Sequence, residues 1–161
     1  MPYSLNLRPI SSAEFSDYEI YFIEDYSKEI TENYPYSKQK AIAIAQEDLE
    51  KSFPERISMT PNELMCIDIT SDQCVNTCGY LWYSHTSNDK KAFICDFYII
   101  NNYRSNGYGQ QAMHTLEELL ASKGVQHITL RVAYQNEQAR RLYQKIGFNI
   151  TGYNMIKKIK N

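Results

Sequence analysis

A polar turn with two glycines lies between residues that predict a buried strand and residues that predict an amphipathic helix. The turn runs from Asn101 to Gly109, with its glycines at positions 107 and 109. A turn of this kind presents consecutive main-chain N–H groups at a helix N-terminus, where unpaired donors and the helix dipole favour an anion. Glycine lets the main chain approach phosphate oxygens closely, and Arg104 adds a positive charge. The segment therefore predicts a phosphate cradle, although a tight turn that uses glycine for geometry alone explains the two glycines equally well.

Two other phosphate-binding loops do not fit this segment. A P-loop requires Gly-Lys followed by Ser or Thr, and Gln110 follows Gly109 here. A dinucleotide fingerprint requires a third glycine and an acidic residue at the end of the next strand, and both are missing. The predicted cradle must therefore be of another kind.

The turn resembles the signature of the GNAT superfamily of N-acetyltransferases. Arg104-Ser-Asn-Gly107-Tyr-Gly109 matches the pattern Arg/Gln-x-x-Gly-x-Gly/Ala. A second match follows at the distance expected for the family, and it consists of Leu130-Arg-Val132, Asn136, Ala139, Leu142-Tyr143 and Gly147-Phe148. The glycine motif alone would be weak evidence. The two matches in the right order make the resemblance specific over residues 99–148.

The resemblance implies that acetyl-CoA is the acyl donor. In the family, the main chain of the strand before the glycine loop pairs with the pantetheine arm, and the loop amides hold the pyrophosphate. Here the strand residues that would take this role are Phe97, Tyr98 and Ile99. The loop residues are Arg104, Ser105, Asn106, Gly107, Tyr108, Gly109 and Gln110. The family also implies a gap between the strand holding Ile99 and the strand holding Val132, into which the acyl arm enters.

Two residues of the second match carry further implied roles. Tyr143 matches a tyrosine that in many members protonates the departing CoA thiolate, and a phenol with a pKa of about 10 keeps its proton at neutral pH. The alternative role for Tyr143 is that of a core tyrosine on an amphipathic helix. Asn136 matches an asparagine that contacts the cofactor. Asparagine is also a preferred helix N-cap, and Asn136 can fill both roles.

The general base is the least determined part of the site. Many family members place a glutamate early in the strand before the loop, and the matching position here holds Phe93. Asp96 on the same strand is the candidate base, acting directly or through water, and a purely structural carboxylate is the alternative. His85 and His114 are weaker candidates.

The elements that must position these residues follow from hydrophobic periodicity. Strands are expected at residues 3–8, 64–69, 75–84, 92–100, 127–133 and 148–159. Helices are expected at residues 11–32, 38–53, 107–123 and 136–146, with Ser11 and Glu14 forming a capping box at the start of the first. The order β-α-α-β-β-β-α-β-α-β predicts an α/β (α+β) fold with a mixed sheet flanked by helices. The resemblance makes this a GNAT-like acyl-CoA N-acyltransferase fold.

The amino-acid composition and net charge exclude several classes of protein. The chain has 161 residues, of which 43% are apolar and 22% charged, and its net charge is -2. These values predict one globular domain over residues 1–161. The near-neutral net charge gives no strongly basic surface, which argues against nucleic acid as a binding partner. No apolar run approaches the ~20 residues of a membrane helix, and no signal-peptide pattern opens the chain. We therefore expect a cytoplasmic protein with no membrane partner.

The cysteines predict neither a metal site nor a catalytic thiol. No His or Cys pair follows Cys74 and Cys78 at zinc spacing, so reduced thiols are expected and no metal. No cysteine is placed with a His and an Asp or Asn as a nucleophilic triad. Direct attack of an amine on the thioester is therefore the expected mechanism.

The sequence favours an N-acetyltransferase that acts on a primary amine of a small molecule or peptide. The first predicted helix is acidic, which suits a cationic acceptor but equally suits a solvated face. A non-catalytic acyl-CoA sensor and a non-enzymatic interaction protein are the alternatives. A homodimer is compatible with the resemblance.

Overall fold

The computed structural model describes residues 2–160, and these residues group into two compact units. The first unit comprises the residues up to Ser16 together with Phe53–Arg131. The second comprises Asp17–Ser52 and the residues from Val132 onward. The expectation that residues 1–161 form one domain stays a prediction.

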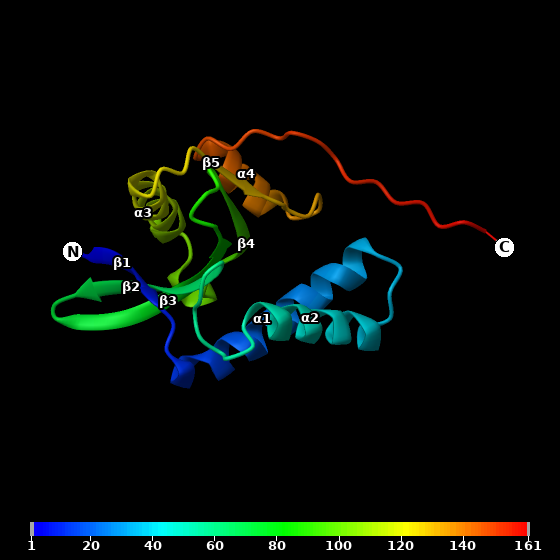
Figure 1. Ribbon diagram of the computed structural model, residues 1–161, viewed down its shortest axis with the longest axis horizontal. Helices are drawn as coiled ribbons and strands as arrows, with labels where there is room; N and C mark the ends of the chain where they lie inside the picture. Colours follow the sequence, from blue (N-terminus) through cyan, green and yellow to red (C-terminus); the bar gives the residue numbers. More distant parts are fainter. Residues whose placement is uncertain (1, 161) are drawn as a thin grey trace. The chain divides into compact units, whose positions relative to one another are not determined.

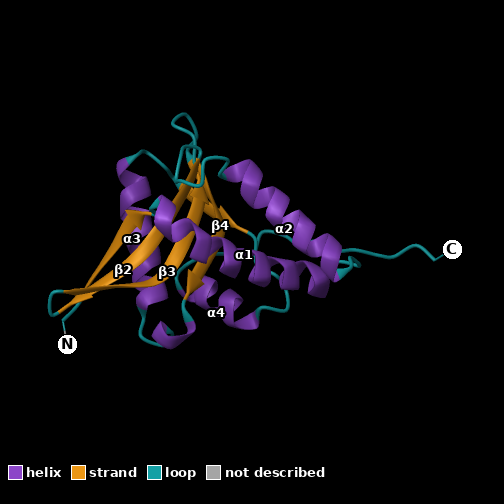
Figure 2. Cartoon of the chain, turned by 90° about the horizontal axis from the view of Figure 1, so that it is seen from below, coloured by secondary structure: helices purple, strands orange, loops and turns teal. Residues whose placement is uncertain are grey.

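A five-stranded mixed sheet forms the centre of the first unit (Figures 1 and 2). Its spatial order follows the chain, and neighbouring strands are antiparallel except for the parallel pair β4–β5. The strands are β1 (Ser4–Pro9), β2 (Asn62–Ser71), β3 (Cys74–Ser84), β4 (Lys91–Ile99) and β5 (His127–Leu130). The mixed sheet expected from the sequence is thereby confirmed.

Helix α3 (Tyr108–Ser122) packs against β1 and β4 in the same unit. It follows β4 through a short 3-10 helix, η1 (Asn101–Tyr103). Its buried residues, Ala112, Met113, Leu116 and Leu120, recur at helical spacing along one face. The helix ends at Ser122, and Gly124, just past the C-cap Lys123, has a φ of 82° that suits glycine. The apolar face and the glycine stop therefore agree with the bounds of α3.

The second unit contains most of α1 (Ser12–Asn33), together with α2 (Lys38–Ser52) and α4 (Glu137–Lys145). The Ser37 hydroxyl accepts a hydrogen bond from Lys40 N at 3.1 Å, so Ser37 caps α2. All four predicted helices are present, with bounds that differ from the predicted ones by a few residues.

The predicted capping box opens α1. Ser11 N donates to Glu14 Oε1 at 3.1 Å, and Glu14 N donates to the Ser11 hydroxyl at 3.3 Å. The Ser11 hydroxyl donates to the same Glu14 oxygen at 2.7 Å. These reciprocal bonds satisfy donors that the first helical turn would leave unpaired.

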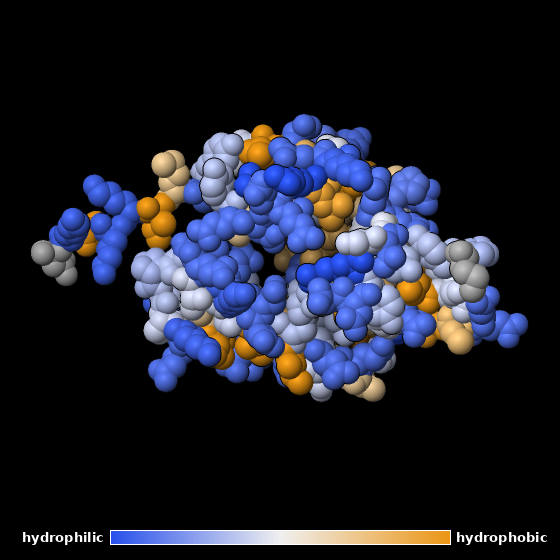
Figure 3. Space-filling model, turned by 180° about the vertical axis from the view of Figure 1, so that it is seen from behind, coloured by the Kyte–Doolittle hydropathy of each residue, from blue (hydrophilic) through white to orange (hydrophobic). Residues whose placement is uncertain are grey.

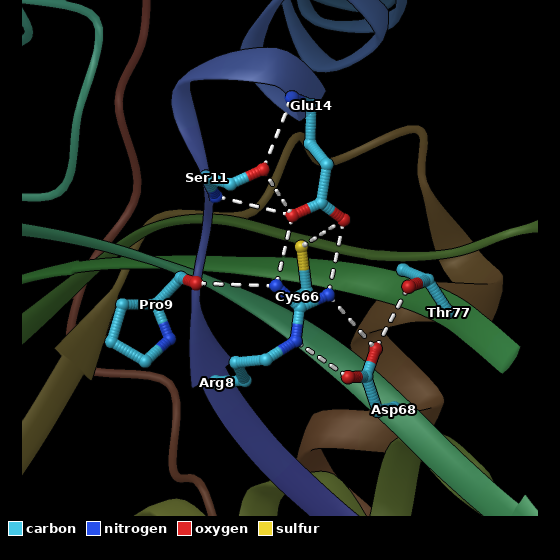
Figure 4. A network of polar contacts seen from close by, with 7 residues as sticks. All are labelled: Arg8, Pro9, Ser11, Glu14, Cys66, Asp68 and Thr77. Carbon is cyan, nitrogen blue, oxygen red and sulfur yellow. Dashed lines mark hydrogen bonds and ion pairs between the residues drawn. The ribbon is translucent and has the colours of Figure 1, made fainter. Parts of the chain in front are cut away.

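Arg8 on β1 ties this helix start to the sheet (Figure 4). Its Nη1 and Nη2 donate to the two carboxylate oxygens of Glu14 at 2.8 and 3.0 Å. Its Nε donates to Asp68 Oδ2 on β2 at 2.7 Å, and Thr77 Oγ1 donates to Asp68 Oδ1 at 2.8 Å. The bond from Arg8 lowers the pKa of Glu14 from 4.5 to about 2. Asp68 is buried, and these hydrogen bonds offset the cost of removing its polar side chain from water.

Two expected strands differ from the structure. The strand expected over residues 127–133 ends at Leu130. The strand expected over residues 148–159 is wrong, because the residues from Phe148 to Lys160 form no ladder with any strand in the described part of the chain. Alternating apolar residues favour an extended chain, but a strand also requires a neighbour to pair with.

Candidate functional site

The parallel strands β4 and β5 pair over only part of β4. The ladder joins Lys91–Ile94 of β4 to His127–Leu130 of β5, residue by residue. β4 continues to Ile99 beyond the last of these pairs. The ladder between β4 and β5 therefore ends at Ile94, and the gap between strands implied by the resemblance stays a prediction.

Main-chain groups on the second half of β4 alternate between two edges. Ile100 N donates to Cys78 O at 2.8 Å, so the main chain of Ile100 faces β3. Because antiparallel ladders alternate, Tyr98 also faces β3, whereas Phe97 and Ile99 direct their N–H and C=O groups to the opposite edge. That edge is the one along which β5 pairs at residues 91–94. Two of the three predicted pantetheine-pairing residues thus present main-chain groups where the ladder with β5 has ended.

The glycine loop presents a continuous series of main-chain donors. The first hydrogen bond of α3 runs from Gln111 N to Gly107 O at 3.1 Å. Among residues 2–160, no acceptor contacts the N–H groups of Ser105, Asn106, Gly107, Tyr108, Gly109 and Gln110. Successive unpaired N–H groups at a helix N-terminus favour a bound anion. The donor series coincides with the predicted pyrophosphate-binding residues.

Two residues of the same loop have a left-handed backbone conformation. Gly107 has a φ of 80° and Ser105 a φ of 65°. No atom lies within 4 Å of the position that a Cβ would take on Gly107, so the space beside it is open. The Asn106 side chain fastens the turn by donating to the carbonyls of Tyr103 and Arg104, both at 3.1 Å. Glycine at 107 therefore serves backbone conformation, with room next to it for a ligand.

Arg104 is held at the end of β4. Its Nε donates to Ile99 O at 2.8 Å, and its Cζ lies 5.2 Å from the centroid of the Tyr98 ring. The geometry is that of a cation–π contact. The Arg104 Nη groups make no hydrogen bond to the rest of the described chain. The guanidinium thus adds a fixed positive charge beside the end of β4, beyond its ladder with β5.

Residues 20–148 match the family described as the Acetyltransferase (GNAT) family. This match spans well over half of the chain and includes both motifs of the sequence. The chain belongs to the GNAT acetyltransferase family.

Relatives over the full length support the GNAT assignment. The chain is 27% identical to the uncharacterized N-acetyltransferase YycN of Bacillus subtilis (strain 168), over 97% of this chain and 99% of that one. It is 26% identical to the uncharacterized N-acetyltransferase YdgE of the same strain, over 97% of this chain and 99% of the relative. The crystal structure of YycN, a putative acetyltransferase, matches with a TM-score of 0.86 and 26% identity, covering 98% of this chain and 100% of YycN. These relatives agree with the membership of the GNAT acetyltransferase family that residues 20–148 show.

A more distant structure shows the same fold. It is the PaiA N-acetyltransferase of Thermoplasma acidophilum in complex with coenzyme A. The TM-score is 0.67 at 16% identity, covering 94% of this chain and 93% of PaiA. At that identity the likeness concerns the fold alone, and it agrees with the mixed five-stranded sheet described above.

The candidate base of this GNAT chain lies beyond an irregularity in β4. The β3–β4 register shifts between Trp82 and Tyr83, which leaves Cys95 as the extra residue on β4. Asp96 is then opposite Trp82, and cross-strand partners share a face of the sheet. Asp96 is half-buried, whereas Phe93 is exposed and offers no group that could take a proton.

The histidines occupy surface positions. His85 Nε2 lies 2.9 Å from Asp89 O, beside the turn between β3 and β4. His114 on α3 is exposed and lies 3.4 Å from a carboxylate oxygen of Glu118. Neither contact gives these rings a catalytic partner, and neither residue is proposed as a base.

The remaining predicted site residues belong to the second unit. Asn136 Oδ1 accepts from Ala139 N at 3.2 Å, so Asn136 is the N-cap of α4. Tyr143 is half-buried on α4, and its ring makes an edge contact with Phe148 at 5.6 Å between centroids. The turn after α4 uses Gly147, whose φ is 108°. The N-cap role of Asn136 is confirmed, and cofactor contacts by Asn136 and Tyr143 stay predictions.

Sequence reasoning missed two positioning residues of the first unit. Gly79 on β3 lies so close to β4 that a Cβ there would overlap the carbonyl oxygen of Tyr98. Tyr3 packs edge-on against Tyr108 at the start of α3, with ring centroids 5.0 Å apart. A glycine inside a strand pattern is itself a signal of close backbone approach. The Tyr3 contact joins distant segments and leaves no local signal.

Burial raises the pKa of three of the four thiols. The pKa is about 12 for Cys66, about 11 for Cys78 and about 11 for Cys95, in each case mainly through desolvation. All four cysteines are free. Residues 2–160 contain no cluster of three or more potential metal ligands, and none of their helices has the length and apolar character of a membrane span.

Proposed function

We propose that this chain transfers the acetyl group of acetyl-CoA to a primary amine of a small molecule or peptide by direct attack. The observation that carries the proposal is the run of six unpaired main-chain donors from Ser105 to Gln110, beside a strand whose ladder with β5 has ended. Coenzyme A carries a pyrophosphate and an extended amide-containing arm. These two chemical features match the donor series and the edge of β4 beyond its ladder with β5.

The residues that hold the donor in this proposal act mainly through their main chains. The N–H groups of residues 105–110 bind the pyrophosphate, with Arg104 adding charge. Phe97 and Ile99 pair with the pantetheine arm as a neighbouring strand would. Acetyl-CoA supplies an activated acetyl thioester. A strand N–H near the thioester carbonyl stabilises the negative charge that develops on its oxygen during attack.

Proton transfers are assigned to two side chains. A primary amine with a lysine-like pKa of about 10.4 must lose a proton before it can attack, and Asp96 is proposed to take that proton directly or through water. Tyr143 is proposed to protonate the CoA thiolate as it leaves, because a phenol keeps its proton at neutral pH. Asn136 is proposed to contact the cofactor while capping α4.

The decisive experiment measures CoA release and CoA binding separately. Wild-type protein and a Tyr143→Phe variant are mixed with acetyl-CoA and a panel of amines, and free thiol is followed over time. We expect the variant to lose most of its turnover while its calorimetric affinity for CoA changes little. Tyr134→Phe is the matched control, because Tyr134 is an exposed tyrosine in the same unit, and it should keep full turnover.

Three results would contradict parts of the proposal. CoA binding without thiol release on any amine would favour an acyl-CoA sensor. No CoA binding at millimolar ligand would refute the cradle. Full turnover by Tyr143→Phe would remove Tyr143 as the acid but leave acetyl transfer intact.

A further inference from the structure

Tyr3, just before β1, is a surface tyrosine whose ring has an aromatic partner. Hydrophilic residues cover most of the face drawn in Figure 3, and apolar ones show in scattered groups. A single apolar side chain at a surface needs no explanation of its own. Tyr3 differs, because its ring meets the Tyr108 ring edge-on, with centroids 5.0 Å apart and an angle of 89° between the planes. Edge-to-face pairs of this geometry are favourable beyond the apolar area that they bury.

Tyr108 is the one residue between the two glycines of the loop. Gly107 and Gly109 carry no side chain that could hold the loop against another element. The N–H of Tyr108 belongs to the series of unpaired main-chain donors, and α3 begins at this residue. Because the N–H groups of residues 108 and 109 flank the Cα that carries the Tyr108 ring, fixing that ring helps to fix the direction of both donors.

Tyr3 is attached to the central sheet. The next residue, Ser4, begins β1 and pairs with Thr70 of β2. β1 also packs against α3, and these elements all belong to the first unit. The Tyr3 ring is therefore a support whose position follows from the ladder between β1 and β2. Through this contact, a segment distant in the chain holds the start of α3.

On the other side of Gly107, the loop is held by its own residues. The Asn106 side chain donates to the carbonyls of Tyr103 and Arg104, both at 3.1 Å. Glycine is the residue with the greatest backbone freedom, and Gly107 thus lies between one residue held locally and one held from the sheet. Donors that are fixed before a ligand arrives bind it without the cost of ordering the loop.

We propose that Tyr3 is a positioning residue for acyl-CoA, which holds Tyr108 so that the main-chain donors after Gly107 face the pyrophosphate. This inference rests on the proposed function, because it concerns the same phosphate cradle. Tyr3 acts through Tyr108 and needs no contact with the ligand. Its effect is confined to acyl donors that carry a pyrophosphate, since the pantetheine arm is assigned to β4.

A truncated acyl donor separates this role from a purely structural one. S-acetylpantetheine has the thioester and the pantetheine arm of acetyl-CoA but lacks the pyrophosphate. Thiol release from each donor is measured for wild type, Tyr3→Leu and Tyr3→Phe, with an amine that wild type acetylates. We expect Tyr3→Leu to lower kcat/KM for acetyl-CoA by about three- to tenfold, through KM, and to leave kcat/KM for S-acetylpantetheine unchanged. Tyr3→Phe keeps the ring contact and should match wild type on both donors.

Two control variants lose similar contacts elsewhere in the chain. Tyr36 in the second unit is 40% exposed, close to the 37% of Tyr3, and its ring stacks on that of Tyr34 with centroids 6.0 Å apart. Ser122 Oγ donates to Leu119 O at 2.6 Å, at the C-terminal end of α3. Tyr36→Leu and Ser122→Ala should each keep kcat/KM for acetyl-CoA within about twofold of wild type.

Three results would overturn the role of Tyr3 while leaving acetyl transfer intact. The first is an unchanged kcat/KM for acetyl-CoA in Tyr3→Leu. The second is an equal loss on both donors, because Tyr3 would then support the fold rather than the pyrophosphate site. The third is a failure of Tyr3→Phe to restore the wild-type value. A wild type that does not bind CoA would instead refute the proposed function, and this inference with it.

Discussion

Gly79 on β3 lies directly against the main chain of Tyr98 on β4. A Cβ on residue 79 would overlap the Tyr98 carbonyl oxygen and would lie 3.2 Å from both Ile99 Cα and the Ile67 side chain. The backbone atoms among these neighbours cannot move aside without displacing β4. Because Phe97 and Ile99 flank this contact, the position of the proposed pantetheine-binding edge depends on the absence of a side chain at residue 79.

Gly79→Ala should weaken CoA binding without abolishing the fold. Adding a methyl group to a tightly packed position costs typically about 1–3 kcal/mol and shifts nearby backbone. We expect calorimetry to show an affinity for CoA reduced by about tenfold, with circular dichroism close to wild type. Gly152→Ala is the control, because a Cβ there would meet nothing within 4 Å. Unchanged CoA affinity in Gly79→Ala would show that the displaced strand does not touch the ligand.

Arg104 should contribute more to the binding of acetyl-CoA than to the rate of the chemical step. Its Nε bond to Ile99 O and its contact with the Tyr98 ring fix the guanidinium beside the glycine loop. Arg104→Gln keeps a polar side chain but removes the charge. We expect the KM for acetyl-CoA to rise by about three- to tenfold, with kcat nearly unchanged.

Two further measurements, at varied salt and on a conservative variant, test whether the charge of Arg104 causes the change in KM. The loss in Arg104→Gln should shrink as ionic strength rises, since salt screens the wild-type charge. Arg104→Lys should recover only part of the affinity, because an ammonium cannot reproduce the planar guanidinium contact. Lys51→Gln, on the exposed surface of α2, serves as the control for loss of one positive charge. A KM insensitive to both substitutions and salt would remove Arg104 from the site.

Local signals predicted the parts of the site that depend on neighbouring residues in the chain. Gly107 lies in a tight turn, as its place between a strand and a helix indicated, and its backbone there is left-handed. Ser11 and Glu14 form the capping box that their spacing predicted, and Asn136 caps α4. Each of these features is decided within a few residues, where side-chain chemistry and backbone geometry act directly.

Contacts between segments that are distant in the chain could not be predicted from the sequence. The extra residue Cys95 on β4 is defined by its register with β3, which periodicity along β4 alone does not reveal. The strand expected up to residue 133 ends at Leu130 because pairing with β4 stops there. The Arg8–Asp68 ion pair joins residues that are adjacent only after β1 and β2 have paired. Strand ends, bulges and long-range ion pairs depend on which strands pair and in which register, so no single segment of the sequence reveals them.

Glu14→Gln should destabilise the protein at neutral pH, and the difference should disappear in acid. The folded-state pKa of Glu14 is lowered to about 2 from 4.5, chiefly by the bond from Arg8. A carboxyl with a lowered folded-state pKa contributes stability above its unfolded pKa and loses it as the pH falls through the folded value. The gap in Tm between wild type and variant should therefore be full at pH 7 and shrink between about pH 4.5 and pH 2.

A surface carboxylate provides the comparison for Glu14. Glu47 pairs with Lys51 at 2.7 Å on α2, where both side chains are exposed. Exposed pairs of this kind contribute little to stability, so Glu47→Gln should leave the Tm nearly unchanged across the same pH range. Equal Tm losses in Glu14→Gln and Glu47→Gln would mean that the Arg8 network adds nothing beyond an ordinary surface pair.

Cys95 should be dispensable for turnover, although it lies on β4 next to the proposed base. Burial raises the pKa of its thiol to about 11, so at neutral pH it stays protonated, and a thiol is a far weaker nucleophile than a thiolate. We expect Cys95→Ala to keep kcat within about threefold of wild type. Intact-mass spectra of wild type incubated with acetyl-CoA alone should contain no acetylated enzyme. An acetyl group on Cys95, together with loss of turnover in Cys95→Ala, would replace direct attack with a two-step mechanism through the enzyme.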